Sequence, residues 1–217
     1  MEPITIPTYV DLEATLQSFK RNDFELTISG TRTWKHPDDL DRYVQTILKG
    51  KPQVVIETGT AWGGSALWFA SMGLQVITID RSARRSVMAR QTNKGKPISW
   101  LISRSTGANA FRRVRSMVQG KRVMVSLDSD HHTPNVIEEI NLYGQLVSPG
   151  CYLVVEDGIF ELLGESGAQW GGDLYRRGGP LLAIQKTLAG RDGWARDLDL
   201  EQLTPVTHSP AGWWIKE

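Results

Sequence analysis

Two apolar segments of this chain, residues 123–127 and 152–155, each lead into acidic residues. The acids are Asp128, Asp130, Glu156 and Asp157, and two histidines, His131 and His132, follow the first pair. An ionised carboxylate at the end of a buried strand costs free energy unless it is paired, hydrogen-bonded, solvated or bound to a metal. The clustering therefore indicates a divalent-cation site with a base beside it.

Oxygen ligands of this kind suit Mg²⁺ best, although Mn²⁺ or Ca²⁺ would also fit, and Zn²⁺ would need a fuller set of His or Cys ligands. We expect Asp128, Glu156 and Asp157 to hold the ion. Asp130 has three interpretations: it orients a neighbouring histidine, it replaces Asp128 as a ligand, or it marks a helix entry on a solvated loop. We favour the first.

A glycine-rich segment follows another apolar stretch, residues 54–56. The sequence from Glu57 to Ser65 reads Glu-Thr-Gly-Thr-Ala-Trp-Gly-Gly-Ser and opens a predicted helix over residues 65–72. Glycines let the backbone approach a ligand, which the first N–H groups of the helix would face. Asp80 ends the next predicted strand, 23 residues after Glu57 in the sequence. An acid at this spacing can accept hydrogen bonds from ribose hydroxyls. We expect a nucleotide-bearing cofactor; the alternative is a tight turn whose glycines serve helix packing.

Eight residues are expected to contact this cofactor. They are Glu57, Thr58, Gly59, Trp62, Gly63, Ser65, Asp80 and Asp128. The glycine spacing differs from the Gly-x-Gly-x-x-Gly pattern of dinucleotide-binding domains, which disfavours an NAD-dependent dehydrogenase.

Short apolar segments alternate with segments of helical periodicity. Strands are predicted at residues 54–56, 76–79, 98–102, 123–127 and 152–155, and helices at 38–49, 65–72, 82–93, 108–118, 133–147 and 180–188. Thr133 is expected to cap its helix, with Pro134 at the first position. This alternation is typical of an α/β fold with a parallel, doubly wound sheet, whose ligands collect at the carboxyl ends of the strands. The polar clusters should converge there.

Residues 1–217 are predicted to form one domain, with a helical extension over residues 1–50. Residues 158–179 are rich in glycine and too long for an ordinary connection, so we interpret them as a substrate lid containing Trp170, Tyr175, Arg176 and Arg177. The tail suggests a hairpin of residues 203–207 with 213–216, anchored by Trp213 and Trp214. His36 and His208 are expected at the surface.

The composition excludes several classes. A net charge of +1 leaves no basic field for nucleic acid. A single cysteine, Cys151, excludes an intramolecular disulfide, and its apolar surroundings favour a buried structural thiol in a reducing, cytoplasmic setting. The N-terminus lacks the features of a signal peptide, and no apolar run approaches the ~20 residues of a membrane helix. We expect no membrane association.

Several segments together resemble the cephalosporin hydroxylase / rhamnosyl O-methyltransferase family. They are Thr33-Trp34, Pro37-Asp38-Asp39-Leu40, Ile56 to Thr60 with Gly63 to Leu67, Leu127 to His131, and Val147 to Gly150 with Val154 to Asp157. The resemblance covers roughly residues 33–160. One departure is Ser103-Arg104-Ser105-Thr106, where many relatives carry Gly-Ser-Ser followed by an acid.

This resemblance implies the class I S-adenosylmethionine methyltransferase fold: a Rossmann-like, seven-stranded, mostly parallel sheet ending in an antiparallel hairpin. It implies that Mg²⁺ is held by an acid after the fourth strand and an acidic pair after the fifth. In the related sugar enzymes, a histidine three positions after the first acid is the base, and that position here is His131. An unperturbed imidazole titrates near ~6.5 and can accept a proton at neutral pH.

The expected function is therefore Mg²⁺-dependent O-methylation of a small-molecule hydroxyl, on a sugar or a glycosylated natural product, by a homo-oligomer. The alternative is a cofactor-binding partner subunit that supports a separate hydroxylase or transferase without chemistry of its own. The acids and His131 argue against the alternative.

Overall fold

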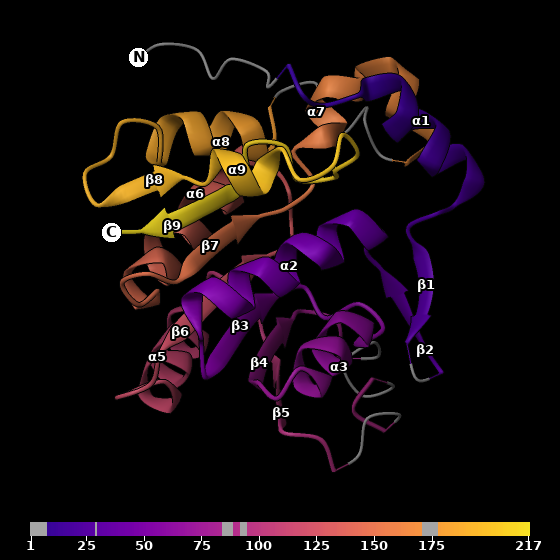
Figure 1. The fold of residues 1–217 in the computed structure, drawn as a ribbon. Helices are drawn as coiled ribbons and strands as arrows, with labels where there is room; N and C mark the ends of the chain where they lie inside the picture. Colours follow the sequence, from indigo (N-terminus) through magenta and orange to yellow (C-terminus); the bar gives the residue numbers. More distant parts are fainter. Residues whose placement is uncertain (1–7, 29, 84–88, 92–94, 171–177) are drawn as a thin grey trace.

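The computed structural model describes residues 8–28, 30–83, 89–91, 95–170 and 178–217. Within these residues, seven strands form one sheet in the order β5-β4-β3-β6-β7-β9-β8 (Figure 1). The strands are β3 (Val54–Thr58), β4 (Gln75–Asp80), β5 (Ile98–Ile102), β6 (Val123–Leu127), β7 (Tyr152–Val155), β8 (Trp194–Arg196) and β9 (Trp213–Lys216). The pairings among β3 to β7 are parallel, and β9 runs antiparallel to both β7 and β8. The predicted fold class is confirmed.

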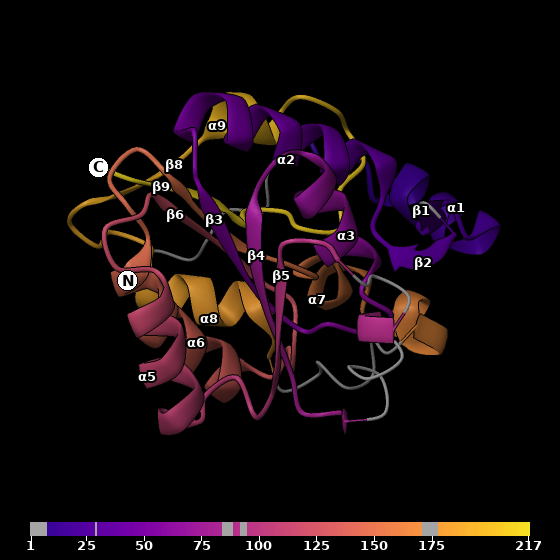
Figure 2. The same cartoon turned by 90° about the horizontal axis from the view of Figure 1, so that it is seen from below.

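Helices cover both faces of the sheet (Figure 2). One face carries α2 (Pro37–Gly50), α3 (Gly64–Ser71) and α9 (Leu198–Glu201), and the other carries α5 (Ala108–Met117), α6 (Thr133–Tyr143) and α8 (Pro180–Thr187). The central strands β3 and β6 are buried at every position, as expected for strands sandwiched between helices. Two apolar clusters result, one on each face of the sheet.

The C-terminal antiparallel pair differs from the prediction in its first strand. Residues 203–207 are not a strand, and β9 instead pairs with β8. The physical reason lies in Arg42 of α2, whose guanidinium is fully buried and donates to the carbonyls of Glu201, Thr204 and Val206. Because these carbonyls accept hydrogen bonds from a side chain, the segment is irregular and does not pair with β9 as a strand.

The N-terminal extension contains a hairpin that the sequence reasoning missed. Helix α1 (Leu12–Arg21) is capped by Asp11, whose side chain accepts from the amide of Ala14 at 2.8 Å. It is followed by β1 (Glu25–Ile28) and β2 (Thr31–Trp34), which pair antiparallel before α2 begins. Four-residue strands alternating in burial give too little periodicity to predict from sequence. Residues 1–7 lie outside the described part.

The start of α6 and the predicted lid differ in part from the sequence-based expectations. Helix α6 is preceded by His132 at the N-cap without a side-chain cap, and the Thr133 hydroxyl instead donates to the carbonyl of Gly179 at 3.1 Å. The predicted lid is partly regular: α7 (Ile159–Leu163) and the 3-10 segment η2 (Gly164–Trp170) occupy its first half. Residues 171–177 of the lid, with Tyr175, Arg176 and Arg177, and much of the predicted helix 82–93 lie outside the described residues.

The expectation of a buried structural thiol is met. Cys151 is buried, with its Sγ 3.3 Å from the carbonyl of Gly50. Among the described residues, no helix combines the length and apolar character needed to cross a membrane.

Candidate active site

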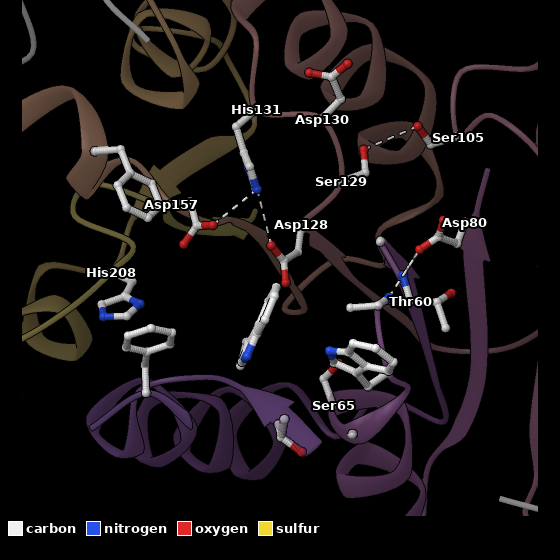
Figure 3. Close-up of a pocket in the computed structure, with 18 of the residues that line it drawn as sticks. Thr60, Ser65, Asp80, Ser105, Asp128, Ser129, Asp130, His131, Asp157 and His208 are labelled. Atoms are coloured by element: carbon white, nitrogen blue, oxygen red, sulfur yellow. Dashed lines mark hydrogen bonds and ion pairs between the residues drawn. The ribbon is translucent and has the colours of Figure 1, made fainter. Parts of the chain in front are cut away.

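A cavity of about 740 Å³ opens where β3, β4, β6 and β7 end (Figure 3). Its walls come from the loops after these strands and from the N-terminal hairpin, which contributes Arg32, Thr33 and Trp34. The carboxyl ends of parallel strands are where ligands of such sheets bind. Of the acids predicted to converge at this edge, Asp80, Asp128 and Asp157 line the cavity, whereas Glu57 and Glu156 do not.

Asp128, His131 and Asp157 meet at one wall of the cavity (Figure 3). The Nε2 atom of His131 lies 3.5 Å from Oδ1 of Asp128 and 3.1 Å from Oδ2 of Asp157. One ligand atom from each of the three residues lies within 4.8 Å of the others, which is compact enough to surround a metal ion. Two carboxylates and an imidazole form a donor set that fits a divalent cation.

Glu156, the third predicted ligand, is not one of the three residues in this group. Its Oε1 accepts hydrogen bonds of 2.7 Å from both Tyr43 and Ser126, and its Oε2 lies 2.7 Å from Nζ of Lys35. The Lys35 ammonium also bonds to Oδ2 of Asp128. Glu156 is therefore part of a buried layer beneath the cavity wall, and does not line the cavity.

Burial raises the pKa of Asp128 well above its ordinary value, and the nearby Glu156 carboxylate raises it further. Burial and Glu156 also raise the pKa of Asp157, whereas the adjacent His131 opposes the shift. Carboxylates crowded together out of water resist ionisation unless a positive charge joins them. Lys35 supplies one such charge to Asp128.

The glycines of the loop after β3 are explained by contacts within the protein. A Cβ added to Gly59 would lie 1.8 Å from the Asp128 carbonyl oxygen, and one on Gly63 would lie 2.9 Å from the Trp100 ring. A Cβ on Gly64 would lie 1.8 Å from Oγ1 of Thr33 in the N-terminal hairpin. These glycines let β6, β5 and the hairpin approach the loop, which matches the packing alternative. They do not exclude a cofactor on the open side.

The eight predicted cofactor residues divide into two groups. Gly59, Trp62, Ser65, Asp80 and Asp128 line the cavity. Glu57, Thr58 and Gly63 do not line it, and all three are buried. Burial raises the pKa of Glu57 to about 7, and one of its oxygens, Oε1, has no hydrogen-bond partner among the described residues. Thr58 joins β3 to β6 by accepting a hydrogen bond from the Asp128 amide.

Asp80 organises the glycine loop. Its Oδ2 accepts hydrogen bonds of 3.1 Å from the amides of Thr60 and Ala61, and its Oδ1 accepts one of 2.6 Å from the amide of Ser82. The side chain is half-buried at the cavity wall (Figure 3). Because each carboxylate oxygen can accept more than one bond, Asp80 can still receive ligand hydroxyls.

Another part of the cavity wall is aromatic, and the sequence did not indicate it. The His208 ring stacks on Phe19 with centroids 4.3 Å apart, and Phe24 and Phe160 also line this side. Burial lowers the pKa of His208 to about 3, so its imidazole is neutral, and its Nε2 has no partner among the described residues. The prediction that His208 lies at the surface is therefore wrong, because its ring is buried.

His36 is also buried, and its Nδ1 accepts from the amide of Asp38 at the start of α2. Asp130 accepts from the amide and from Nδ1 of His132, the latter at 2.6 Å, so it orients His132 rather than His131. Trp213 and Trp214 are buried in β9, as expected. No local pattern marks Lys35, although it stands between two segments that carry the family resemblance.

Comparison with known proteins places this fold and site in a family. The family model described as Rhamnosyl O-methyltransferase/CmcI matches residues 22–217. The chain belongs to this family. It is 34% identical over 140 residues to the rhamnosyl O-methyltransferase of Mycobacterium bovis, covering 60% of this chain and 56% of that protein. This chain thus matches a little over half the length of that relative.

Solved structures of lower identity share the fold. A CmcI structure described as an Mg-SAM form has a TM-score of 0.60 and 19% identity, covering 88% of this chain and 76% of that chain. An apo structure of CmcI also has a TM-score of 0.60, with 17% identity, covering 100% of this chain and 89% of that chain.

Proposed function

We propose that this chain is an S-adenosylmethionine-dependent O-methyltransferase that methylates a hydroxyl of a small molecule with the aid of Mg²⁺. The observation that supports this most is the meeting of Asp128, His131 and Asp157 in the same cavity as the glycine loop and Asp80. Family membership and the mycobacterial relatives named rhamnosyl O-methyltransferase support the reaction class.

In this proposal the cofactor occupies the side of the cavity lined by Gly59, Trp62 and Asp80, where the Asp80 carboxylate accepts hydroxyl hydrogen bonds. Arg104 and Ser105 from the loop after β5 line the same cavity. They stand in the segment that departs from the family pattern, and their contacts to a cofactor would differ accordingly.

Asp128 and Asp157 would hold the metal, with Glu156 as the third predicted ligand if its carboxylate turns. When bound, the ion would polarise the acceptor hydroxyl and lower its pKa, while S-adenosylmethionine supplies the methyl group. His131 would accept the hydroxyl proton at Nε2, which already faces both aspartates. The alternative role of His131 is that of a ligand, since its Nε2 lies within the same group.

The acceptor would lie between this polar wall and the aromatic wall of Phe24 and His208. We propose a sugar or a glycosylated natural product, in line with the names of the relatives. Positioning matters most here, because methyl transfer needs an aligned nucleophile rather than a covalent intermediate. That the chain acts as a homo-oligomer also stays a prediction.

The test is methyl transfer from labelled S-adenosylmethionine to a panel of rhamnosides and other glycosides by the purified chain, with Mg²⁺ or with EDTA. Label should enter an acceptor without a second protein and should fall sharply in EDTA. Cofactor binding by calorimetry with no transfer to any acceptor until a second protein is added would favour the partner-subunit alternative. Absence of cofactor binding would overturn the proposal.

A further inference from the structure

Lys35 is a buried lysine whose ammonium lies among carboxylates. Its side chain is 3% exposed, and its Nζ bonds to Oδ2 of Asp128 and lies 2.7 Å from Oε2 of Glu156. The backbone amide of Lys35 donates to the carbonyl of Phe24 at 3.0 Å, which ties the residue to the N-terminal hairpin. Lys35 thus reaches from the hairpin to the ends of β6 and β7.

One ammonium cannot neutralise the acids around it. Asp128, Glu156 and Asp157 follow two neighbouring strands, and Glu57 at the end of β3 also attracts the Lys35 charge. The buried Arg42 forms an ion pair with Asp39 and donates to backbone carbonyls, so its charge is compensated by a different carboxylate. A divalent ion would supply the positive charge that the cluster lacks.

The lysine and a divalent ion would share a carboxylate. Asp128 presents Oδ2 to Lys35 and Oδ1 to His131, so its two oxygens face opposite sides. An ion bound at Asp128 and Asp157 would therefore lie one carboxylate away from the Lys35 ammonium, where like charges repel strongly because little water separates them. If Glu156 also turned to the ion, it would have to leave Lys35.

We propose that Lys35 is the internal counter-cation of this carboxylate cluster and that a divalent ion binds in competition with it. Without the ion, the ammonium reduces the repulsion between the Asp128 and Glu156 carboxylates, which both contact it. With the ion, the same ammonium weakens binding. The inference rests on the proposed metal function of the site and adds the residue that sets its affinity.

The first test is calorimetric titration of Mn²⁺ and Mg²⁺ into Lys35→Met and Lys35→Arg. Lys35→Met should bind the ions about tenfold more tightly or better, as expected when a like charge at ion-pair distance is removed. Lys35→Arg keeps the charge and should stay near the wild-type affinity. Lys49→Met, which removes an exposed lysine paired with Asp197, is the matched control and should bind as wild type does.

The second test is thermal unfolding with Mn²⁺ and with EDTA. Lys35→Met should unfold at a lower temperature than wild type in EDTA and should gain more from Mn²⁺, since the ion then replaces the positive charge that the lysine supplied. The double variant Lys35→Met with Glu156→Gln should recover stability in EDTA, because one carboxylate leaves with the lysine. If Lys35→Met folds only with Mn²⁺ present, that result also supports the proposal.

The outcomes separate this inference from the proposed function. Weaker ion binding by Lys35→Met than by wild type would overturn the role of Lys35 and leave the proposed metal site intact. Ion binding by Lys35→Met but not by wild type would support the proposed competition between Lys35 and the ion. It would contradict a metal-dependent reaction. Failure of Lys35→Met to fold with or without Mn²⁺, together with failure of the double variant, would overturn the counter-cation role.

Discussion

The Nε2 atom of His131 lies 3.1 Å from Oδ2 of Asp157, a residue that follows a different strand. The two side chains come from the loops after β6 and β7, which are parallel neighbours in the sheet. The contact places His131, the proposed base, beside a carboxylate proposed to hold the metal.

His131→Asn should lower the methylation rate by about 10²–10⁴-fold, the usual contribution of a general base. Affinity for Mg²⁺ should change little if His131 is a base, and should fall with the rate if His131 is a ligand. Rates and calorimetric titrations on the same variant separate the two roles. His132→Asn is the comparison, because its exposed ring pairs with Asp130 instead, and a loss as large as that of His131→Asn would contradict the assignment.

Asp128→Asn should weaken Mg²⁺ binding and turnover far more than S-adenosylmethionine binding. The substitution keeps the shape of the side chain but removes the charge that attracts the ion and pairs with Lys35. Calorimetry with each ligand, alongside turnover at saturating cofactor, checks this. Weaker cofactor binding with an unchanged methylation rate would show that Asp128 serves the cofactor and not a metal.

Glu139 should give the protein a pH-dependent stability. Burial raises its pKa to about 7 from the ordinary 4.5, so between these values the folded chain holds a proton that the unfolded chain has released. Stability contributed by this group is therefore lost as the pH rises through that window. Between about pH 5 and 8, wild type should lose up to about 3 kcal/mol more unfolding free energy than Glu139→Gln.

Urea unfolding at a series of pH values measures this difference. Glu57 and His208 also have shifted pKa values, but they titrate in both proteins, so the difference between the two curves isolates Glu139. Glu138→Gln, one position earlier on α6 and exposed, should show the wild-type pH profile. Parallel curves for wild type and Glu139→Gln would contradict the prediction.

Arg42→Met should destabilise the protein by about 3–5 kcal/mol, the cost of breaking a buried ion pair by removing one partner. The change leaves the buried Asp39 carboxylate without its ion-pair partner. It also removes the hydrogen-bond donors to three carbonyls of residues 201–206. Lys49→Met on the same helix breaks an ion pair whose lysine is 47% exposed, and should cost less than about 1 kcal/mol. Equal losses in denaturant unfolding would refute the structural role of Arg42.

Elements with strong local signals were predicted well from the sequence. Strands β3 and β6 begin with the apolar runs 54–56 and 123–125, and α5 and α8 end where their periodicity ends. Parallel strands with short apolar runs can only be buried between helices, so the fold class followed from the pattern. The hairpin of β1 and β2, and the partner of β9, carry no comparable local signal.

The sequence by itself determined which acids stand at strand ends and that they must meet at one edge of the sheet. The alternation of strands with helices and the carboxyl-end rule sufficed for Asp80, Asp128 and Asp157. Only the tertiary structure decided that Glu156 faces Lys35 and that His208 is buried against Phe19. Those positions depend on side-chain direction and on contacts between segments far apart in the chain, which no periodicity encodes.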